Sequence, residues 1–260
     1  MALGTIKPYK LRIALLHIAP RAGEILFNRN QIRYALAIAA GYGAQLAITP
    51  ELAESGYMFS RHIDLNTIPA CPNEFISDLR QVASKYTMHL IIGFPERGLN
   101  NALYNTLAYI DAYGRIQGIY RKVHVNHYEG SWETAGEEVV IKKIEGLPVG
   151  FLIGEDICYT DIAYQSKKMG ARLLLAQTAW PRVEWDASKE WEKCSKAAGV
   201  PLIVCNRTGS EEGIDFTQSE SIVVAHQKIA YTFTTRMPMV FIVDFDLSTD
   251  CFSFIGSMKL

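Results

Sequence analysis

Cys158 is the residue of this sequence with the strongest potential for covalent chemistry. It follows the apolar run 149–153 and the turn 154–157, and it precedes a segment expected to be helical. A cysteine at a strand–turn–helix junction exposes its sulfur and lies beside N–H groups that can face a reacting carbonyl. The helix N-terminus is also expected to lower the thiol pKa. This context fits a nucleophile and fits equally a cysteine packed at a strand end.

Two charged residues stand at the ends of other apolar runs. Glu51 follows the run 45–49 and Pro50, and ligands of α/β sheets bind at the carboxyl ends of parallel strands. Glu51 is therefore a candidate general base, and the alternative is a surface or helix-capping carboxylate. Lys122 ends another run, where a lysine ordinarily meets solvent.

The segment 124–136 holds further candidates for acid–base chemistry. Glu129 lies among aromatic residues, which would raise its pKa unless the loop leaves it in solvent. His124 and His127 are rival partners for Cys158, as in papain-like enzymes. The sequence has no Gly-x-Ser-x-Gly, no His-Glu-x-x-His and no glycine-rich phosphate-binding pattern. Serine hydrolases, zinc hydrolases and nucleotide-binding proteins thus have no motif support.

The elements that would position these residues alternate between strands and helices. Apolar runs bounded by turn residues predict about eleven strands, among them 45–49, 115–120 and 149–153. Helical spacing of apolar residues predicts at least about five helices, which include 28–41, 73–86, 161–169 and 185–198. This alternation predicts an α/β fold with much parallel pairing, and the hairpins make its sheets mixed. Because no low-complexity linker or fixed-period repeat interrupts it, we expect residues 1–260 to form a single domain.

Composition limits the classes of partner. The chain has 260 residues, of which 49% are hydrophobic and 20% charged, and its net charge is −1. No basic face or tail indicates a nucleic-acid partner, and no polybasic cluster or long apolar run indicates a membrane. A small molecule is therefore the expected partner.

The five cysteines stand at 71, 158, 194, 205 and 251. Their number is odd, none forms a Cys-x-x-Cys pair, and none has zinc-site spacing with histidine. Together with the absence of a signal-peptide layout, this predicts a reduced, cytoplasmic protein without a metal site.

Taken in order, the motifs resemble those of the nitrilase superfamily of carbon–nitrogen hydrolases. The likeness extends over most of the chain and rests on four segments: Pro50-Glu51 followed by Ser55-Gly56-Tyr57, Tyr120-Arg121-Lys122-Val123-His124, Gly154-Glu155-Asp156-Ile157-Cys158-Tyr159, and Trp180-Pro181. Each motif alone is weak. Together, in this order and at suitable separations, they are specific.

The resemblance implies a fold, a reaction and a site. The implied fold is a four-layer α-β-β-α sandwich with two mixed sheets. The implied reaction cleaves an amide or N-carbamoyl amide of a small molecule through a cysteine thioester, with no metal or organic cofactor. Cys158 would be the nucleophile and Glu51 the general base, and Lys122 with the Tyr159 N–H would stabilise the oxyanion. Members of this family usually form homodimers or larger homo-oligomers.

The resemblance also implies roles for residues around this set. Glu129 matches the spacing of the family's second glutamate and would orient Lys122, and Glu133 is the competing choice. Tyr57, Tyr159 and Trp180 would contact the substrate.

The sequence departs from the family directly after the nucleophile. Many members continue with Asp-x-Arg-Phe-Pro-Glu, whereas this chain has Thr160-Asp161-Ile162-Ala163-Tyr164-Gln165. Substrate preference therefore cannot be transferred from the well-known amidase branches. Nitrile hydrolysis by the same residues and a catalytically idle binding protein of the same fold are the two alternatives.

Overall fold

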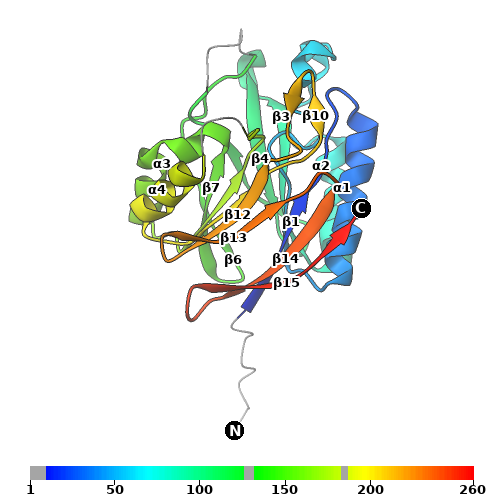
Figure 1. Cartoon of the computed structure of the whole chain (residues 1–260). Helices are drawn as coiled ribbons and strands as arrows, with labels where there is room; N and C mark the ends of the chain where they lie inside the picture. Colours follow the sequence, from blue (N-terminus) through cyan, green and yellow to red (C-terminus); the bar gives the residue numbers. More distant parts are fainter. Residues whose placement is uncertain (1–9, 126–131, 183–186) are drawn as a thin grey trace.

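The computed structural model describes residues 10–125, 132–182 and 187–260. Two β-sheets pack face to face, and α-helices cover the outer face of each (Figure 1). The prediction of an α/β fold with four layers and two mixed sheets is confirmed.

The first sheet contains seven strands in the order β15-β14-β1-β2-β3-β4-β5. Its central strands β1, β2 and β3 run parallel, and all other neighbours are antiparallel. The strands are β1 (Lys10–His17), β2 (Leu46–Ile48), β3 (His89–Arg97), β4 (Leu103–Ile110), β5 (Ile116–Arg121), β14 (Met239–Asp246) and β15 (Cys251–Lys259).

The second sheet contains six strands in the order β13-β12-β9-β8-β7-β6. Here β7, β8 and β9 run parallel and the flanking strands antiparallel. The strands are β6 (Ile141–Ile144), β7 (Leu147–Ile153), β8 (Leu173–Gln177), β9 (Leu202–Cys205), β12 (Glu220–Ala225) and β13 (Lys228–Thr234). A separate short hairpin joins β10 (Ser210–Glu211) to β11 (Ile214–Asp215).

Two helices cover each sheet. The apolar faces of α1 (Ile25–Gly41) and α2 (Glu74–Tyr86) pack on the first sheet, and α3 (Thr160–Lys168) and α4 (Ser188–Ala198) pack on the second. The predicted N-cap is present, because the Asn73 side chain accepts a hydrogen bond of 2.7 Å from the Ile76 N–H. None of these helices in the described ranges is long and apolar enough to cross a membrane.

The prediction of at least five helices holds for the described residues only when single helical turns are counted. These residues contain four α-helices and several short 3-10 helices: η1 (Phe59–Arg61), η2 (Leu65–Thr67), η3 (Leu99–Asn101) and η5 (Gly154–Cys158). Single turns of this kind are too short to show a hydrophobic period in the sequence.

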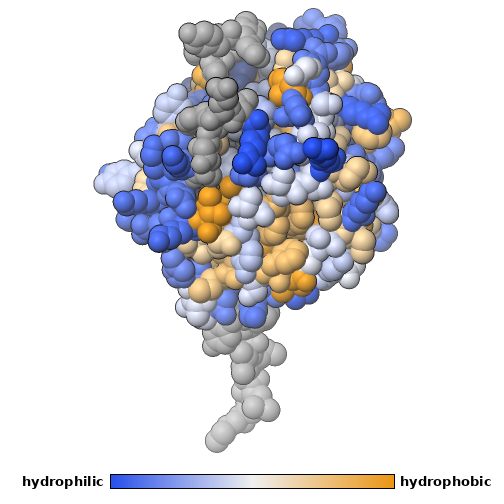
Figure 2. Space-filling view, viewed as in Figure 1, coloured by the Kyte–Doolittle hydropathy of each residue, from blue (hydrophilic) through white to orange (hydrophobic). Residues whose placement is uncertain are grey.

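The last strand, β15, was not predicted. It pairs with β14 along its whole length and forms the edge of the first sheet. Its side chains do not alternate regularly between buried and exposed, because Phe254 and Ile255 are both exposed. Figure 2 shows apolar surface on the face of the molecule where β13, β14 and β15 lie.

The parallel strands of both sheets end at a common edge. The Gln177 amide, at the end of β8, donates a hydrogen bond of 3.0 Å to the Thr49 hydroxyl, just after β2. This contact joins the two sheets where the segments bearing Glu51 and Cys158 leave them. Ligand sites of α/β sheets occupy this kind of edge.

Candidate active site

Glu51 and Lys122 form a buried ion pair at this edge. Lys122 Nζ lies 3.2 Å from Glu51 Oε1, and both side chains are almost fully buried, with 3% and 2% of their surface exposed. Glu51 follows β2 and Lys122 follows β5, so the two lie 71 positions apart in the chain. The structure thus brings together two residues that the sequence marked by their places at strand ends and by their motifs.

The Glu51 carboxylate is held by fixed donors. Asn105 Nδ2 donates to Oε1 at 2.7 Å, and the Ala179 N–H donates to Oε2 at 3.0 Å. Burial raises the pKa of Glu51, and Lys122, Asn105 and Ala179 oppose that rise. A buried carboxylate with a raised pKa can accept a proton and return it during one reaction cycle.

Lys122 faces two more carboxylates. Glu133 Oε1 lies 3.8 Å from Lys122 Nζ, and Glu155 Oε2 is in direct contact with it. Burial lowers the pKa of Lys122, but the attraction of Glu51, Glu155 and Glu133 outweighs it and raises that pKa well above its ordinary value. The side chain therefore remains an ammonium throughout the neutral range.

Glu133 occupies the neighbourhood predicted for the second glutamate. Glu129 and His127 lie outside the described residues. Burial raises the pKa of Glu133 to about 7, although Lys122 lowers it. Glu133 Oε1 and Asn105 Oδ1 are both buried, and neither has a hydrogen-bond partner among the described residues.

The turn that carries the nucleophile rests against the ion pair. A Cβ atom at Gly154, the first residue of η5, would lie 2.8 Å and 3.0 Å from the two carboxylate oxygens of Glu51. It would also lie 3.0 Å from Lys122 Nζ, and Gly154 has a φ of +52°. Glycine is required here for space as well as for backbone conformation.

Cys158 ends η5 and is partly buried, two residues before α3 begins. The expectation of a lowered thiol pKa is not met. Burial, followed by the negative charges of Glu155, Glu190 and Asp156, raises the pKa of Cys158 to about 11. These effects outweigh the opposing charge of Lys122, so the resting group is a thiol that needs a base.

Asp156, which sequence reasoning missed, ties the nucleophile turn to the lysine segment. Its buried carboxylate accepts hydrogen bonds from the Tyr120 hydroxyl at 2.6 Å, the His124 N–H at 2.8 Å and the Ile153 N–H at 3.1 Å. Tyr120 and His124 lie two positions before and two positions after Lys122, and Ile153 directly precedes Gly154. The Asp156 carboxylate therefore connects the end of β5 in the first sheet to the end of β7 in the second. The only signal in the sequence was an acidic residue inside the nucleophile turn.

His124 does not pair with Cys158 in this structure. Its Nδ1 lies 3.2 Å from Asp156 Oδ1, and its Nε2 lies 3.4 Å from Asp161 Oδ2. Both ring nitrogens therefore face carboxylates, which raise the pKa of His124. The imidazole also stacks on Tyr159, with ring centroids 4.0 Å apart.

The three residues predicted to contact substrate lie around the site. Burial raises the pKa of the Tyr57 hydroxyl, and so do the nearby charges of Glu51 and Glu155. The Tyr159 ring is half exposed, and its N–H donates to the Asp156 carbonyl at 3.3 Å. The Trp180 backbone exchanges two hydrogen bonds with the Asn206 side chain. Their contact with a substrate stays a prediction.

A second buried pair supports the loop that carries Tyr57. Glu211 Oε2 accepts hydrogen bonds from the Tyr57 and Met58 N–H groups at 2.9 Å and 3.1 Å. Its Oε1 lies 2.9 Å from Arg207 Nη1, and the Arg207 guanidinium covers the Phe216 ring. The sequence analysis gave neither Arg207 nor Glu211 a role, because charged residues are mostly exposed and nothing in the sequence places these two inside the protein.

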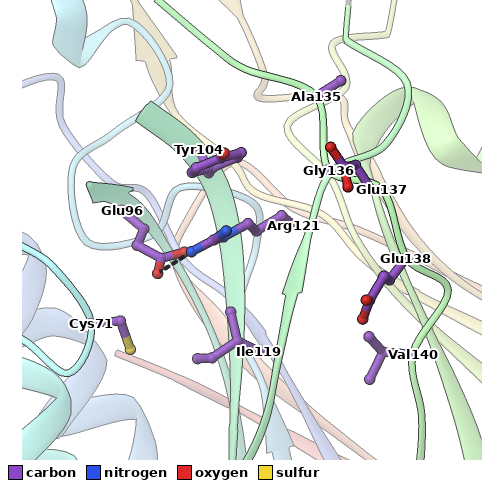
Figure 3. Close-up of a pocket in the computed structure, with 10 residues that line it drawn as sticks. All are labelled: Cys71, Glu96, Tyr104, Ile119, Arg121, Ala135, Gly136, Glu137, Glu138 and Val140. Carbon is purple, nitrogen blue, oxygen red and sulfur yellow. Dashed lines mark hydrogen bonds and ion pairs between the residues drawn. The ribbon is translucent and has the colours of Figure 1, made fainter. Parts of the chain in front are cut away.

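A separate pocket of about 410 Å³ lies on the helix-facing side of the first sheet. Alternation along β5 points Ile119 and Arg121 to that side, whereas Tyr120 enters the core between the sheets. Figure 3 shows Arg121 reaching across this pocket to Glu96, with Tyr104 above it and Cys71 beyond. Neither Glu51, Lys122 nor Cys158 lines it. In the described ranges, no group of three or more His, Cys, Asp or Glu residues suits a metal ion.

Comparison with known proteins gives one family. The model of a family described as carbon–nitrogen hydrolase matches residues 12–249 of this chain.

Individual relatives have low sequence identity to this chain. A citrullinase of Francisella tularensis is 32% identical over 75% of this chain and 75% of its own length. A probable nitrilase of Schizosaccharomyces pombe is 27% identical over 82% of this chain and 80% of its own. Among solved structures, an amidase from Nesterenkonia sp. superposes with a TM-score of 0.80 at 24% identity, covering 91% of this chain and 90% of that one.

Proposed function

This chain belongs to the carbon–nitrogen hydrolases of the nitrilase superfamily, and from that premise we propose that it cleaves an amide or N-carbamoyl amide of a small molecule through a thioester on Cys158. The observation that carries the proposal is the buried pair of Glu51 and Lys122 with the Cys158 turn packed against it. A base, a permanent cation and a thiol are the parts that acyl transfer through a cysteine needs.

In the first step the Cys158 sulfur attacks the substrate carbonyl and a C–S bond forms. Glu51 takes the thiol proton, which the thiol would not release to water at neutral pH, because its pKa is about 11. The carbonyl oxygen gains the negative charge, and the Lys122 ammonium stabilises it. Removing one such donor typically costs about 10²–10³ in rate.

In the second step the tetrahedral intermediate collapses. The C–N bond breaks, the proton on Glu51 passes to the leaving ammonia or amine, and a thioester remains. Glu51 then removes a proton from water as the water attacks the thioester carbonyl. When the C–S bond breaks, that proton returns to the sulfur and the carboxylic acid leaves.

We assign Glu133 as the second glutamate, which orients Lys122 from 3.8 Å. Glu129, the residue first expected in this role, is the alternative. Lys122 serves as the principal oxyanion donor. The Tyr159 N–H already donates to the Asp156 carbonyl, and it would have to share its proton with the oxyanion.

The assignment of the nucleophile is tested by Cys158→Ala. This variant should keep its circular dichroism spectrum and lose turnover of any amide that the wild type hydrolyses. Cys251→Ser, at an exposed cysteine, is the matched control and should retain activity. Wild-type protein stopped during turnover should carry the mass of the acyl group on Cys158. Wild-type turnover by the Cys158→Ala variant would refute the mechanism.

Nitrile hydrolysis is the second candidate, because one relative is named a probable nitrilase. Supplying an amide and its matched nitrile separates the two activities by their rates. An idle binding protein would turn over neither.

We also propose that residues 1–260 form a single cytoplasmic domain that associates as a homodimer or larger homo-oligomer. One apolar core joins both sheets, and the five cysteines are all free thiols. Light scattering during size exclusion measures the oligomeric state, and a single monomer mass at micromolar concentration would contradict the association.

A further inference from the structure

Glu155 adds a third carboxylate to the ammonium of Lys122. Its Oε2 contacts Lys122 Nζ, which also lies 3.2 Å from Glu51 and 3.8 Å from Glu133. Three carboxylates thus face one cation. The mechanism proposed above uses Glu51 and Glu133, and it gives Glu155 no role.

Backbone geometry places Glu155 beside the nucleophile. Both residues belong to the 3-10 helix η5, and they are three positions apart. Side chains at positions i and i+3 of a 3-10 helix eclipse one another, so Glu155 and Cys158 project from the same side. Among the charged groups around the thiol, Glu155 raises the pKa of Cys158 the most.

Glu155 is also the most accessible of the three carboxylates. Its side chain is 24% exposed, compared with 2% for Glu51 and 11% for Glu133. An entering substrate therefore meets Glu155 before it meets the other two. Glu51 and Glu133 are buried beside the reacting groups, whereas Glu155 is exposed enough to contact a substrate and so to discriminate between substrates.

The contact with Lys122 conflicts with the proposed chemistry. An ammonium has three N–H donors; Glu51 and Glu155 lie within hydrogen-bond distance of Lys122 Nζ, and Glu133 lies 3.8 Å away, beyond that distance. The oxyanion forms at the carbon that Cys158 attacks, on the side where Glu155 projects, so it takes the place of the Glu155 carboxylate on Lys122. A carboxylate released without a new partner would repel the developing oxyanion.

We propose that Glu155 is a specificity-determining residue, which selects amides that carry a positively charged ammonium or guanidinium group close to the carbonyl. The inference rests on the proposed hydrolase function and names its substrate class. The substrate cation draws Glu155 away from Lys122, and the N–H that is released binds the carbonyl oxygen. A neutral amide has no charge that would draw Glu155 away from Lys122. An anionic amide would bring a further negative charge next to Glu155.

The geometry limits where the cation can lie. One hydrogen bond separates the carbonyl oxygen from Lys122 and another separates the cation from Glu155, each about 3 Å long. Glu155 starts in contact with Lys122, which adds a third link of similar length, so the cation should lie within roughly 9 Å of the carbonyl oxygen. Short amino amides, with the charge a few bonds from the reacting carbon, meet this condition.

The test uses three amides of similar size: 4-aminobutanamide (cationic), pentanamide (neutral) and succinamate (anionic). Wild-type enzyme should have a kcat/KM for 4-aminobutanamide at least about tenfold above pentanamide, and above succinamate by more. In Glu155→Gln the ratio of cationic to neutral kcat/KM should fall at least about tenfold.

Glu190→Gln is the matched control. It removes a negative charge that also acts on Cys158, but Glu190 pairs with Lys193 at 2.6 Å. It should keep the wild-type ratio. The inference is overturned if wild-type enzyme does not prefer the cationic amide, if Glu155→Gln keeps the preference, or if Glu190→Gln loses it equally.

Binding to Cys158→Ala separates this inference from the proposed function. Calorimetry on that variant should give at least about tenfold tighter binding of 4-aminobutanamide than of pentanamide. If that preference appears but the wild type hydrolyses no amide, the hydrolase proposal fails and the selectivity stands. Equal or undetectable binding of all three amides overturns the selectivity, whether or not the wild type hydrolyses them.

Discussion

Lys122 opposes the effect of burial on the two buried acids beside it, Glu51 and Glu133. Glu51, Glu133 and Glu155 all lie within 4 Å of its Nζ, and burial raises the pKa of the first two. The ammonium opposes that rise, because an adjacent positive charge favours a carboxylate. Its removal would therefore affect the general base as well as the oxyanion.

This coupling makes Lys122→Ala more damaging than the loss of a single donor. We expect kcat/KM to fall by at least about 10²–10³, the range for one oxyanion donor, with a further loss because Glu51 then holds its proton. Steady-state kinetics measure the effect. Lys143→Ala, at an exposed lysine on β6, is the control and should be unchanged. A decrease below about tenfold would move the oxyanion role to another group.

At the residue scale the sequence marked groups at the ends of predicted strands, groups in the segment 124–136, and the residues of the family motifs. Glu51 and Cys158 qualified because the carboxyl ends of parallel strands share one edge. Asn105 lies inside β4, and Glu155 and Asp156 read as turn residues, so their parts depend on tertiary contacts. The thiol pKa was mispredicted for a related reason: burial, the largest cause of its rise, depends on tertiary contacts.

Among the elements, η5 is tightly constrained at its first residue. The Gly154 backbone packs directly against the Glu51 carboxylate. The φ of Gly154 is +52°, which is unfavourable for residues other than glycine. At its other end, η5 presents Cys158. A change at Gly154 should therefore reach the nucleophile and the base together.

Gly154→Ala tests this position. Its Cβ would lie 2.8 Å from Glu51 Oε1, so the turn or the carboxylate must shift. A misplacement of about 1 Å can cost about 10²-fold in rate, and we expect a loss of that size in kcat. Gly146→Ala is the matched control, because Gly146 has a φ of +83° and a Cβ added there would meet no atom within 4 Å. Both variants should lose stability, but only Gly154→Ala should lose activity, and equal activity losses would contradict this role of η5.

Elements with a clear hydrophobic pattern were predictable. The α2 helix, with its Asn73 cap, and the central strands of each sheet have continuous or periodic apolar faces. The β15 strand was not predictable, because its exposure follows no alternation and its pairing with β14 is what orders it. Short 3-10 helices such as η5 lack a readable period altogether.

For the whole molecule, the buried acids of the site make the free energy of unfolding depend on pH. Glu133 has a folded pKa raised to about 7, above its ordinary value of 4.5. A group with a raised pKa contributes its full stability below the unfolded pKa, and loses that contribution as pH rises through the folded pKa. Glu133 should therefore reduce the stability of the wild type progressively between pH 4.5 and 7.

The variant Glu133→Gln isolates this contribution, because glutamine has nearly the same size and does not titrate. Glu51, Glu155 and Lys122 remain in both proteins, so the difference in unfolding free energy reports mainly on Glu133. Measured by urea denaturation across this range, the difference should move in favour of the variant by about 3.5 kcal/mol at most, since the shift spans about 2.5 pKa units and each corresponds to about 1.4 kcal/mol. Glu137→Gln, at an exposed glutamate, should show no such trend. A difference that is constant with pH, or that moves in favour of the variant toward acid, would show that the Glu133 carboxylate is ionised and satisfied by Lys122 throughout.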